Sequence, residues 1–207
     1  HVRSRRQRQM CIRDSVTDAM YIWDAEAKTW RGWSQSAGSY NGGSSIIPMG
    51  QGFWVEATGI PTLTMTESAK VGNTIPLQRI AEVENNISVS LEAKGSDDLV
   101  TTDIRISDLA TAGYDEEYDM AYLSRNLFSE FNSIPLLDIA SGTNDGKKLF
   151  INTLPISGEE IIPLHITTTT GNEHVLTITK ENYSLNSQVY LVDNVLNTEV
   201  LVEDVIS

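Results

Sequence analysis

Apolar and polar residues alternate along much of the chain. Asn86–Ala93 reads NISVSLEA and Val100–Ile106 reads VTTDIRI, so every second side chain in each segment is apolar or a threonine. A strand places successive side chains on opposite faces, so this period of two predicts strands with one buried face. Similar alternation or β-branched runs predict further strands at Phe53–Ala57, Thr62–Thr66, Leu149–Leu154, Ile162–Ile166, Leu176–Thr179, Gln188–Val192 and Thr198–Val202.

Turn-forming residues separate these segments. Gly, Asn, Asp and Ser recur at short intervals, as in Asn144-Asp145-Gly146 before Leu149–Leu154. Many short strands joined by such turns are typical of a sandwich. We therefore expect an all-β fold: an antiparallel β-sandwich of jelly-roll or immunoglobulin-like type, with a smaller N-terminal β region and at most one short helix. Pro163 predicts that Ile162–Ile166 lies at a sheet edge, because proline cannot donate a hydrogen bond to a neighbouring strand.

One segment has a different period. Between Asp115 and Phe131 apolar residues recur at steps of three and four. This spacing predicts a short helix or a helical turn. The acidic residues at its start would suit the positive end of a helix dipole.

The N-terminal part differs in composition, since it holds all four tryptophans. Met20–Trp23 and Thr29–Trp33 flank a short polar stretch and predict a hairpin, and Gly38–Ser45 reads as a flexible loop. Residues 67–85 lack periodicity and read as a linker. The predicted division is a tail over 1–15, a partial Trp-rich β region over 16–75 and a β-sandwich domain over 76–207, with the boundary near Pro76.

The first 15 residues differ again. They contain five arginines and the only cysteine, Cys11, against one acid, Asp14. A basic arm that touches nucleic acid or a membrane is one interpretation. The codons of Arg5–Asp14 can also be written so that they resemble, base for base, the adapter of transposase-based sequencing libraries. We therefore interpret residues 1–15 as a non-native, disordered tail, and we expect a metagenomic fragment truncated at both ends.

The remaining residues are strongly acidic. The whole chain has 15 Lys and Arg against 28 Asp and Glu, a formal charge of −13, and removing residues 1–15 takes that charge to −17. Proteins that bind nucleic acids neutralise phosphates with Lys and Arg, so this balance argues against a nucleic-acid partner. No apolar run approaches the roughly 20 residues of a membrane-spanning helix, so we expect no membrane insertion. A single cysteine excludes a disulfide framework.

Residues 16–207 contain few groups suited to catalysis. Neither His165 nor His174 stands at zinc-ligand spacing from another histidine or cysteine, and we expect His165 to face solvent. The sequence has no nucleophile elbow, metalloprotease helix motif or phosphate-binding loop. Asp97-Asp98 and Glu159-Glu160 are paired acids, which a glycosidase needs across a cleft, but solvated charge in turns is the simpler interpretation. We predict a protein that is not an enzyme, with no catalytic or cofactor-binding residue.

The densest acidic cluster consists of Asp115, Glu116, Glu117 and Asp119. Calcium binds several oxygen ligands at once, which makes this cluster the candidate for a calcium site. The EF-hand pattern is absent, and a solvated helix start is the alternative interpretation.

The aromatic residues offer a second candidate site. They would stack on sugar rings if they shared an exposed face, although packing in a small β core is the favoured interpretation. These residues are Trp23, Trp30, Trp33, Tyr40 and Trp54. Phe53 and Trp54 are adjacent in a predicted strand, so they should point to opposite faces with one more exposed than the other.

Several short motifs occur in an ordered series over residues 46–206. IIPMGQGFWVEATG (46–59) and LTMTESAKV (63–71) resemble a stretch common in large bacterial proteins exported by the type IX secretion route. Downstream matches are Ala112–Asp115 with Tyr118-Asp119, Leu149–Pro155, Ile162–Ile166 and Val189–Asp193. The resemblance implies a β-sandwich that precedes a C-terminal sorting domain, which directs export and surface attachment, and we expect that this fragment lacks that domain.

Together these observations predict a non-catalytic structural or adhesion-type β-sandwich module of a secreted or cell-surface bacterial protein. The alternative is an accessory, carbohydrate-binding region of an extracellular hydrolase whose catalytic domain lies upstream. The expected partner is the remainder of the parent polypeptide, and surface glycans or other proteins are further candidates.

Overall fold

A computed structural model describes residues 16–24, 27, 29–47, 50–57, 85–95, 98–124, 137–155, 160–168, 173–203 and 205–206. Within these ranges the protein is all-β and contains no helix, which confirms the predicted fold class. The described residues therefore hold no helix that could cross a membrane. The predicted tail over 1–15, the strand at Thr62–Thr66 and the boundary near Pro76 lie outside these ranges.

The N-terminal strands form a four-stranded antiparallel sheet in the order β3-β2-β1-β4. The strands are β1 (Val16–Asp24), β2 (Thr29–Ser34), β3 (Gly38–Tyr40) and β4 (Trp54–Ala57). The predicted hairpin is confirmed, because Asp24 pairs with Thr29 across the β1–β2 turn and its Oδ1 accepts the Ala27 N–H at 3.0 Å. The predicted loop over Gly38–Ser45 is wrong in its first three residues, which form β3.

The larger sheet has eight strands in the order β10-β8-β9-β6-β5-β11-β14, with β7 paired to β9. The strands are β5 (Asn86–Ala93), β6 (Leu99–Ile106), β7 (Met120–Ala121), β8 (Leu137–Gly142), β9 (Lys148–Leu154), β10 (Leu164–Thr168), β11 (His174–Glu181) and β14 (Val205–Ile206). Its pairs are antiparallel except for β6 and β9, which run parallel with Asp103 opposite Ile151. A separate hairpin consists of β12 (Val189–Asp193) and β13 (Thr198–Val202).

The predicted alternation sets the faces of the larger sheet. In β5, Ile87, Val89, Leu91 and Ala93 are buried, whereas Glu92 is exposed. The edge predicted from Pro163 is also confirmed, because β10 stands at the end of the strand order. The Pro163 carbonyl accepts the Gly142 N–H at 2.8 Å, immediately before β10 begins.

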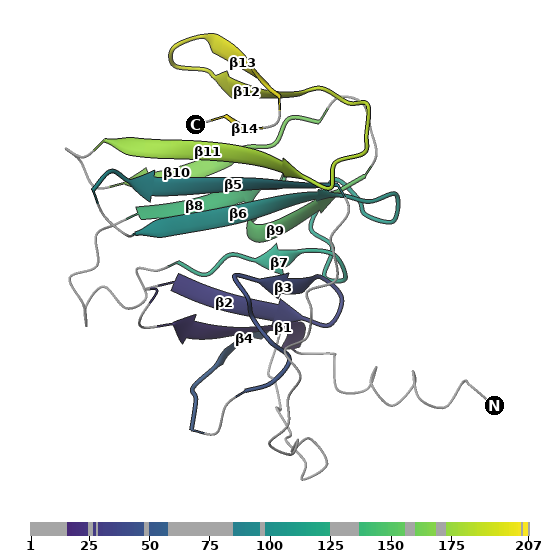
Figure 1. The fold of residues 1–207 in the computed structure, drawn as a ribbon. Helices are drawn as coiled ribbons and strands as arrows, with labels where there is room; N and C mark the ends of the chain where they lie inside the picture. Colours follow the sequence, from purple (N-terminus) through teal and green to yellow (C-terminus); the bar gives the residue numbers. More distant parts are fainter. Residues whose placement is uncertain are drawn as a thin grey trace.

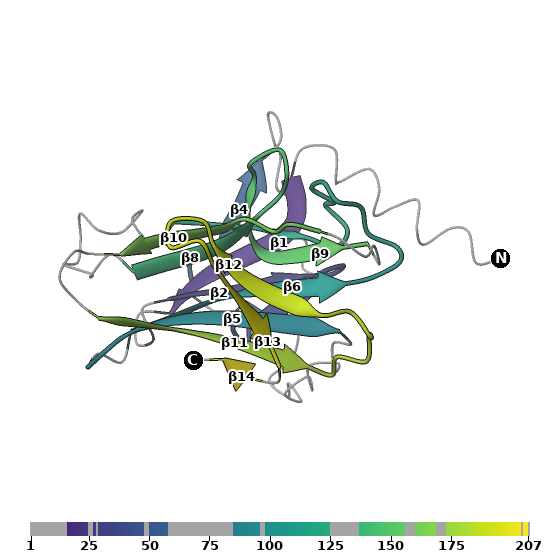
Figure 2. The ribbon, with the colours of Figure 1, turned by 90° about the horizontal axis from the view of Figure 1, so that it is seen from above.

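The elements form three layers (Figure 1). The β12–β13 hairpin packs on one face of the larger sheet, and the small sheet packs on the other; Figure 2 shows the layers from above. The first core joins Val202 of the hairpin to strands β5, β6, β8, β9 and β11. The second core joins the small sheet to β7 and β9 through Tyr21, Trp30, Tyr40, Met120 and Phe150.

The helix predicted from Asp115 does not form over the described part of that segment. The Asp119 N–H donates to the Asp115 carbonyl at 2.8 Å, which makes a single helical turn. The chain then enters β7, where Met120 pairs with Ile151 of β9. Of the residues that give the three- and four-residue spacing, Met120 and Leu123 join the core between the sheets. The later residues of the predicted helix, 125–131, lie outside the described ranges.

Candidate functional site

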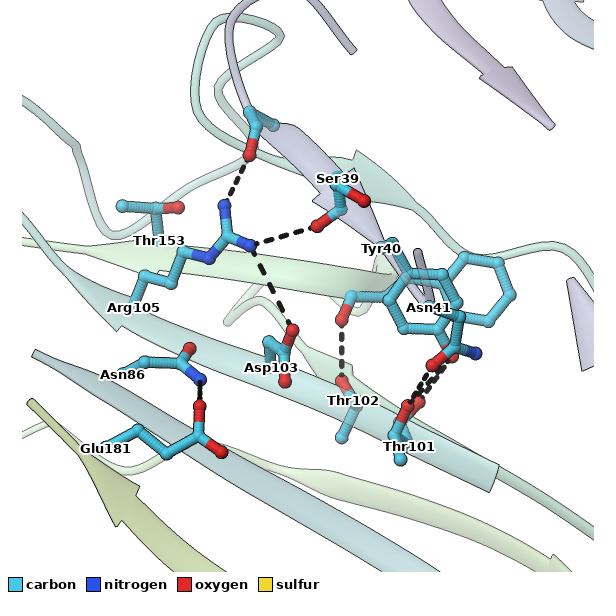
Figure 3. Close-up of polar contacts among 12 residues, drawn as sticks. Ser39, Tyr40, Asn41, Asn86, Thr101, Thr102, Asp103, Arg105, Thr153 and Glu181 are labelled. Atoms are coloured by element: carbon cyan, nitrogen blue, oxygen red, sulfur yellow. Dashed lines mark hydrogen bonds and ion pairs between the residues drawn. The ribbon is translucent and has the colours of Figure 1, made fainter. Parts of the chain in front are cut away.

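Polar side chains connect the two sheets where β3 lies against β6 (Figure 3). The Tyr40 hydroxyl donates to the Thr101 carbonyl at 2.7 Å. The Thr101 hydroxyl in turn donates to Asn41 Oδ1 at 3.0 Å. The Tyr40 ring stacks on Phe150, with 4.4 Å between the ring centroids and 21° between the ring planes. This group of contacts joins the sheets by both stacking and hydrogen bonds.

Arg105 makes the second connection between the sheets. Its guanidinium donates from Nη1 to the Ala37 carbonyl and from Nη2 to the Ser39 carbonyl, the latter at 3.3 Å. Asp103 Oδ2 lies 4.0 Å from Nη2. Burial lowers the pKa of Arg105 and raises the pKa of Asp103, while each charge partly offsets the burial of the other. The flat guanidinium suits this role because it directs two donors at two carbonyls at once.

Sequence reasoning missed this connection. Thr101, Asp103 and Arg105 occupy the polar positions of an alternating strand, which the pattern assigns to solvent. The small sheet covers that face instead: the Thr101 hydroxyl bonds Asn41 Oδ1, the Arg105 guanidinium bonds the Ala37 and Ser39 carbonyls, and Asp103 lies beside that guanidinium. An arginine at a polar position of an alternating strand is a weak signal, since the solvent-facing side of a sheet often carries one.

The acidic cluster is divided between the interior and the surface. Asp119 is buried, and its two oxygens accept the N–H groups of Asp115 and Thr153, each at 2.7 Å. Asp115 Oδ2 accepts the Thr111 N–H at 2.6 Å, whereas Glu116 and Glu117 are exposed. Over the part of the chain that the structure describes, no three His, Cys, Asp or Glu side chains are grouped to hold a metal ion. The two aspartates thus act as acceptors that shape the turn.

Burial raises the pKa of Asp119 to about 6, although its two backbone donors oppose that shift. A carboxyl with this pKa gains or loses its proton in a mildly acidic solution. The group is enclosed by its own turn and by β9, so this titration bears on folding.

A third cluster lies beside β4. Lys147 Nζ is 3.1 Å from the centroid of the Tyr114 ring and 3.8 Å from Glu56 Oε1. Burial, and after it the charge of Glu56, raises the pKa of Tyr114, so its hydroxyl stays protonated. The ammonium is held by an aromatic face and a carboxylate, which links β4 to the turn after β8.

The burial of the histidines and of the paired acids differs in part from what the sequence predicts. His165 is half-buried and not solvent-facing: its ring covers Gly142, where an added Cβ would meet Nε2 at 2.7 Å. Burial lowers the pKa of His165, and nearby Lys148 adds to the effect. His174 begins β11 opposite Ala93. Asp98 is buried and not solvated.

Of the paired acids, Asp97 and Glu159 lie outside the described residues, and Glu160 is exposed. The structure therefore does not place either pair across a cleft within the described part of the chain.

The aromatic residues occupy both faces of the small sheet. Trp30 and Tyr40 are buried, which confirms that they pack in a core. Trp23 and Trp54 contact Trp30 edge-to-face, with centroids 5.3 and 6.2 Å away. Trp33 pairs with Met20, and successive residues of a strand point to opposite faces. Trp33 therefore lies on the face of the small sheet opposite to Tyr21 and Trp30. The five aromatics do not share one exposed face.

Trp54 keeps 46% of its surface exposed, whereas Phe53 is half-buried. One residue of the pair is thus more exposed than the other, as the sequence predicts.

Comparisons of the chain with protein-family models, curated proteins and solved structures give no match. The geometry of the described residues is therefore the basis on which a function is inferred.

Proposed function

We propose that this chain is a non-catalytic structural or adhesion-type β-sandwich module of a secreted or cell-surface bacterial protein. One observation carries the proposal: Tyr40 and Arg105, from opposite sheets, each donate to a backbone carbonyl of the other sheet. Side chains used in this way hold the sheets together and are not free to act on a substrate. The acidic surface suits a soluble extracellular module, since strong net charge opposes association.

A spacer or stalk must keep its parts together when its neighbours pull on it. The stacked pair Tyr40–Phe150 and the Arg105 contacts couple the small sheet to the centre of the larger one. Buried contacts of this kind make neighbouring elements unfold together. The motif resemblance to exported bacterial proteins supports the same role.

A pulling experiment tests this proposal. We expect the chain, held between two marker domains in a single-molecule instrument, to unfold in one step. The Tyr40→Ala variant should lower the unfolding force or divide the step in two.

A second experiment tests for catalysis by incubating the wild-type chain with chromogenic glycosides, esters and peptides. Turnover that a single substitution in the described residues abolishes would contradict the proposal.

One observation favours the carbohydrate-binding alternative. Trp54 exposes 46% of its surface while its ring rests on Trp30, which resembles a stacking platform for a sugar ring. A glycan array tests this function. Binding that is lost in Trp54→Ala and kept in Trp33→Ala would favour the accessory role. Equal binding by the two variants, or none by the wild type, would reject it.

A further inference from the structure

The β12–β13 hairpin presents an apolar surface away from the core. Val189, Leu191 and Val202 pack against the larger sheet. The alternate positions lie on the outer face, where Tyr190 is opposite Leu201 and Val192 is opposite Glu199; all four are exposed. At the tip, Val195 and Leu196 are 92% and 72% exposed. Figure 1 shows this hairpin on the side of the larger sheet opposite β1–β4.

The tip has a defined conformation. Asp193 Oδ1 accepts the N–H groups of Val195 at 2.8 Å and of Leu196 at 3.0 Å. Asn197 closes the turn with a φ of 51°, in the left-handed region that asparagine tolerates. Two aliphatic side chains are thus held outward by the turn itself. A preorganised surface loses less conformational entropy on binding.

The charged residues of the hairpin and its flanks have one sign. Residues 184–203 contain Asp193, Glu199 and Glu203 and no Lys, Arg or His. All three acids are exposed. A second copy would bring the same acids and a formal charge of −13 to the contact, and an anionic bilayer would repel them as well. Charge complementarity therefore favours a basic partner.

We propose that the tip and outer face of the β12–β13 hairpin bind an apolar pocket rimmed by Lys or Arg on a partner protein. Val195 and Leu196 enter the pocket, and Glu199 and Glu203 meet the basic rim. Exposed apolar patches with a polar border mark such interaction sites. This docking surface is independent of whether the module serves as a spacer or binds sugars.

Surface plasmon resonance on a defined monolayer tests the proposal. The probe is a mixed monolayer of alkyl and ammonium groups, in about 0.15 M salt. We expect the wild-type chain to bind it, and the double variant Val195→Ser/Leu196→Ser to bind at least about tenfold more weakly. The matched control, Leu109→Ser/Ile161→Ser, changes residues that are 68% and 86% exposed elsewhere and should bind as the wild type does. Glu199→Gln/Glu203→Gln should weaken binding and reduce its dependence on salt, and it leaves Asp193 to hold the tip.

Four results would overturn the proposal. The first is equal binding by the hairpin variant and its control, or no binding by the wild type. The second is equal binding to a monolayer of alkyl and carboxylate groups. The third is dimerisation in sedimentation velocity that the hairpin variant abolishes, which would assign the surface to a second copy. The fourth is stronger binding to phosphatidylcholine vesicles than to the mixed monolayer, which would assign it to a membrane.

Discussion

The ring of Tyr40, on the small sheet, stacks on the ring of Phe150, on the larger sheet, with their centroids 4.4 Å apart. Beyond the stack, the Tyr40 hydroxyl donates a hydrogen bond to the Thr101 carbonyl on β6. One side chain thus supplies apolar contact and a hydrogen bond to two different strands of the larger sheet. We therefore expect the small sheet to unfold together with the larger one.

Tyr40→Phe should keep the stack and lose the hydrogen bond. We expect it to lower the free energy of unfolding by about 1 kcal/mol, and Tyr40→Ala to lower it by about 3–5 kcal/mol because the ring is also lost. Urea denaturation measures both values. Tyr190→Phe is the control, since the Tyr190 hydroxyl bonds the nearby Gln188 side chain on an exposed hairpin. A Tyr190→Phe effect as large as that of Tyr40→Phe would contradict the account.

Gly43 lies where the backbone leaves no room for a side chain. A Cβ at this position would stand 1.9 Å from the Gly32 carbonyl oxygen of β2, and backbone cannot move aside as a flexible side chain can. Gly43→Ala should therefore destabilise the fold by about 1–3 kcal/mol or more. Gly52→Ala has open space around its Cβ and should change the urea midpoint little. Similar midpoints for the two variants would show that the loop after β3 is not closely packed on β2.

Arg105→Met removes both donors to the Ala37 and Ser39 carbonyls. Two acceptors then lose their partner in a largely buried place, which should cost about 1–3 kcal/mol in urea denaturation. Arg31→Met is the matched control: Arg31 pairs with Asp24 at 2.5 Å, but its side chain is exposed, so we expect at most about 1 kcal/mol. Equal losses would mean that Arg105 acts as an ordinary surface charge.

The strand pattern of the larger sheet could be predicted where one face is buried and the other is not. The interval Asn86–Ala93 matches β5, and Thr198–Val202 matches β13. Strand β8 was missed because Leu137–Gly142 is buried throughout, so its polar residues Asp138 and Ser141 do not mark a solvent face. A strand buried on both faces loses the alternation on which the prediction depends.

The candidate sites could be predicted less well, because they depend on which sheet covers which face. The sequence placed Asp119 in an acidic cluster, but the side chain is buried and accepts the backbone N–H groups of Asp115 and Thr153. Arg105 and Tyr40 are far apart in sequence and meet the opposite sheet only after the layers pack. Local patterns carry no information on such long-range contacts.

Asp119→Asn should change how stability depends on pH. Burial raises the pKa of Asp119 in the folded state to about 6, whereas an aspartate carboxyl in the unfolded chain has a pKa of about 4. Between these values the folded state holds more protons, so this group's contribution to stability is greatest below about pH 4 and falls until about pH 6.

The amide that Asp119→Asn introduces would place an NH₂ group against one of the two backbone donors, which should cost about 1–3 kcal/mol. Urea denaturation from acidic to neutral pH should therefore give a larger difference between wild type and Asp119→Asn on the acidic side. A difference that grows toward neutral pH would show that the carboxylate, and not the protonated carboxyl, is the form that the fold prefers.

Equilibrium unfolding followed by two probes would show whether the two sheets form one structural unit. All four tryptophans lie in the small sheet, so their fluorescence reports that sheet, whereas far-ultraviolet circular dichroism reports mainly the strands of the larger one. We expect coincident transitions with one midpoint, and Tyr40→Ala should lower both midpoints together. A fluorescence transition that is complete while the circular dichroism signal remains native would show that the two sheets unfold separately.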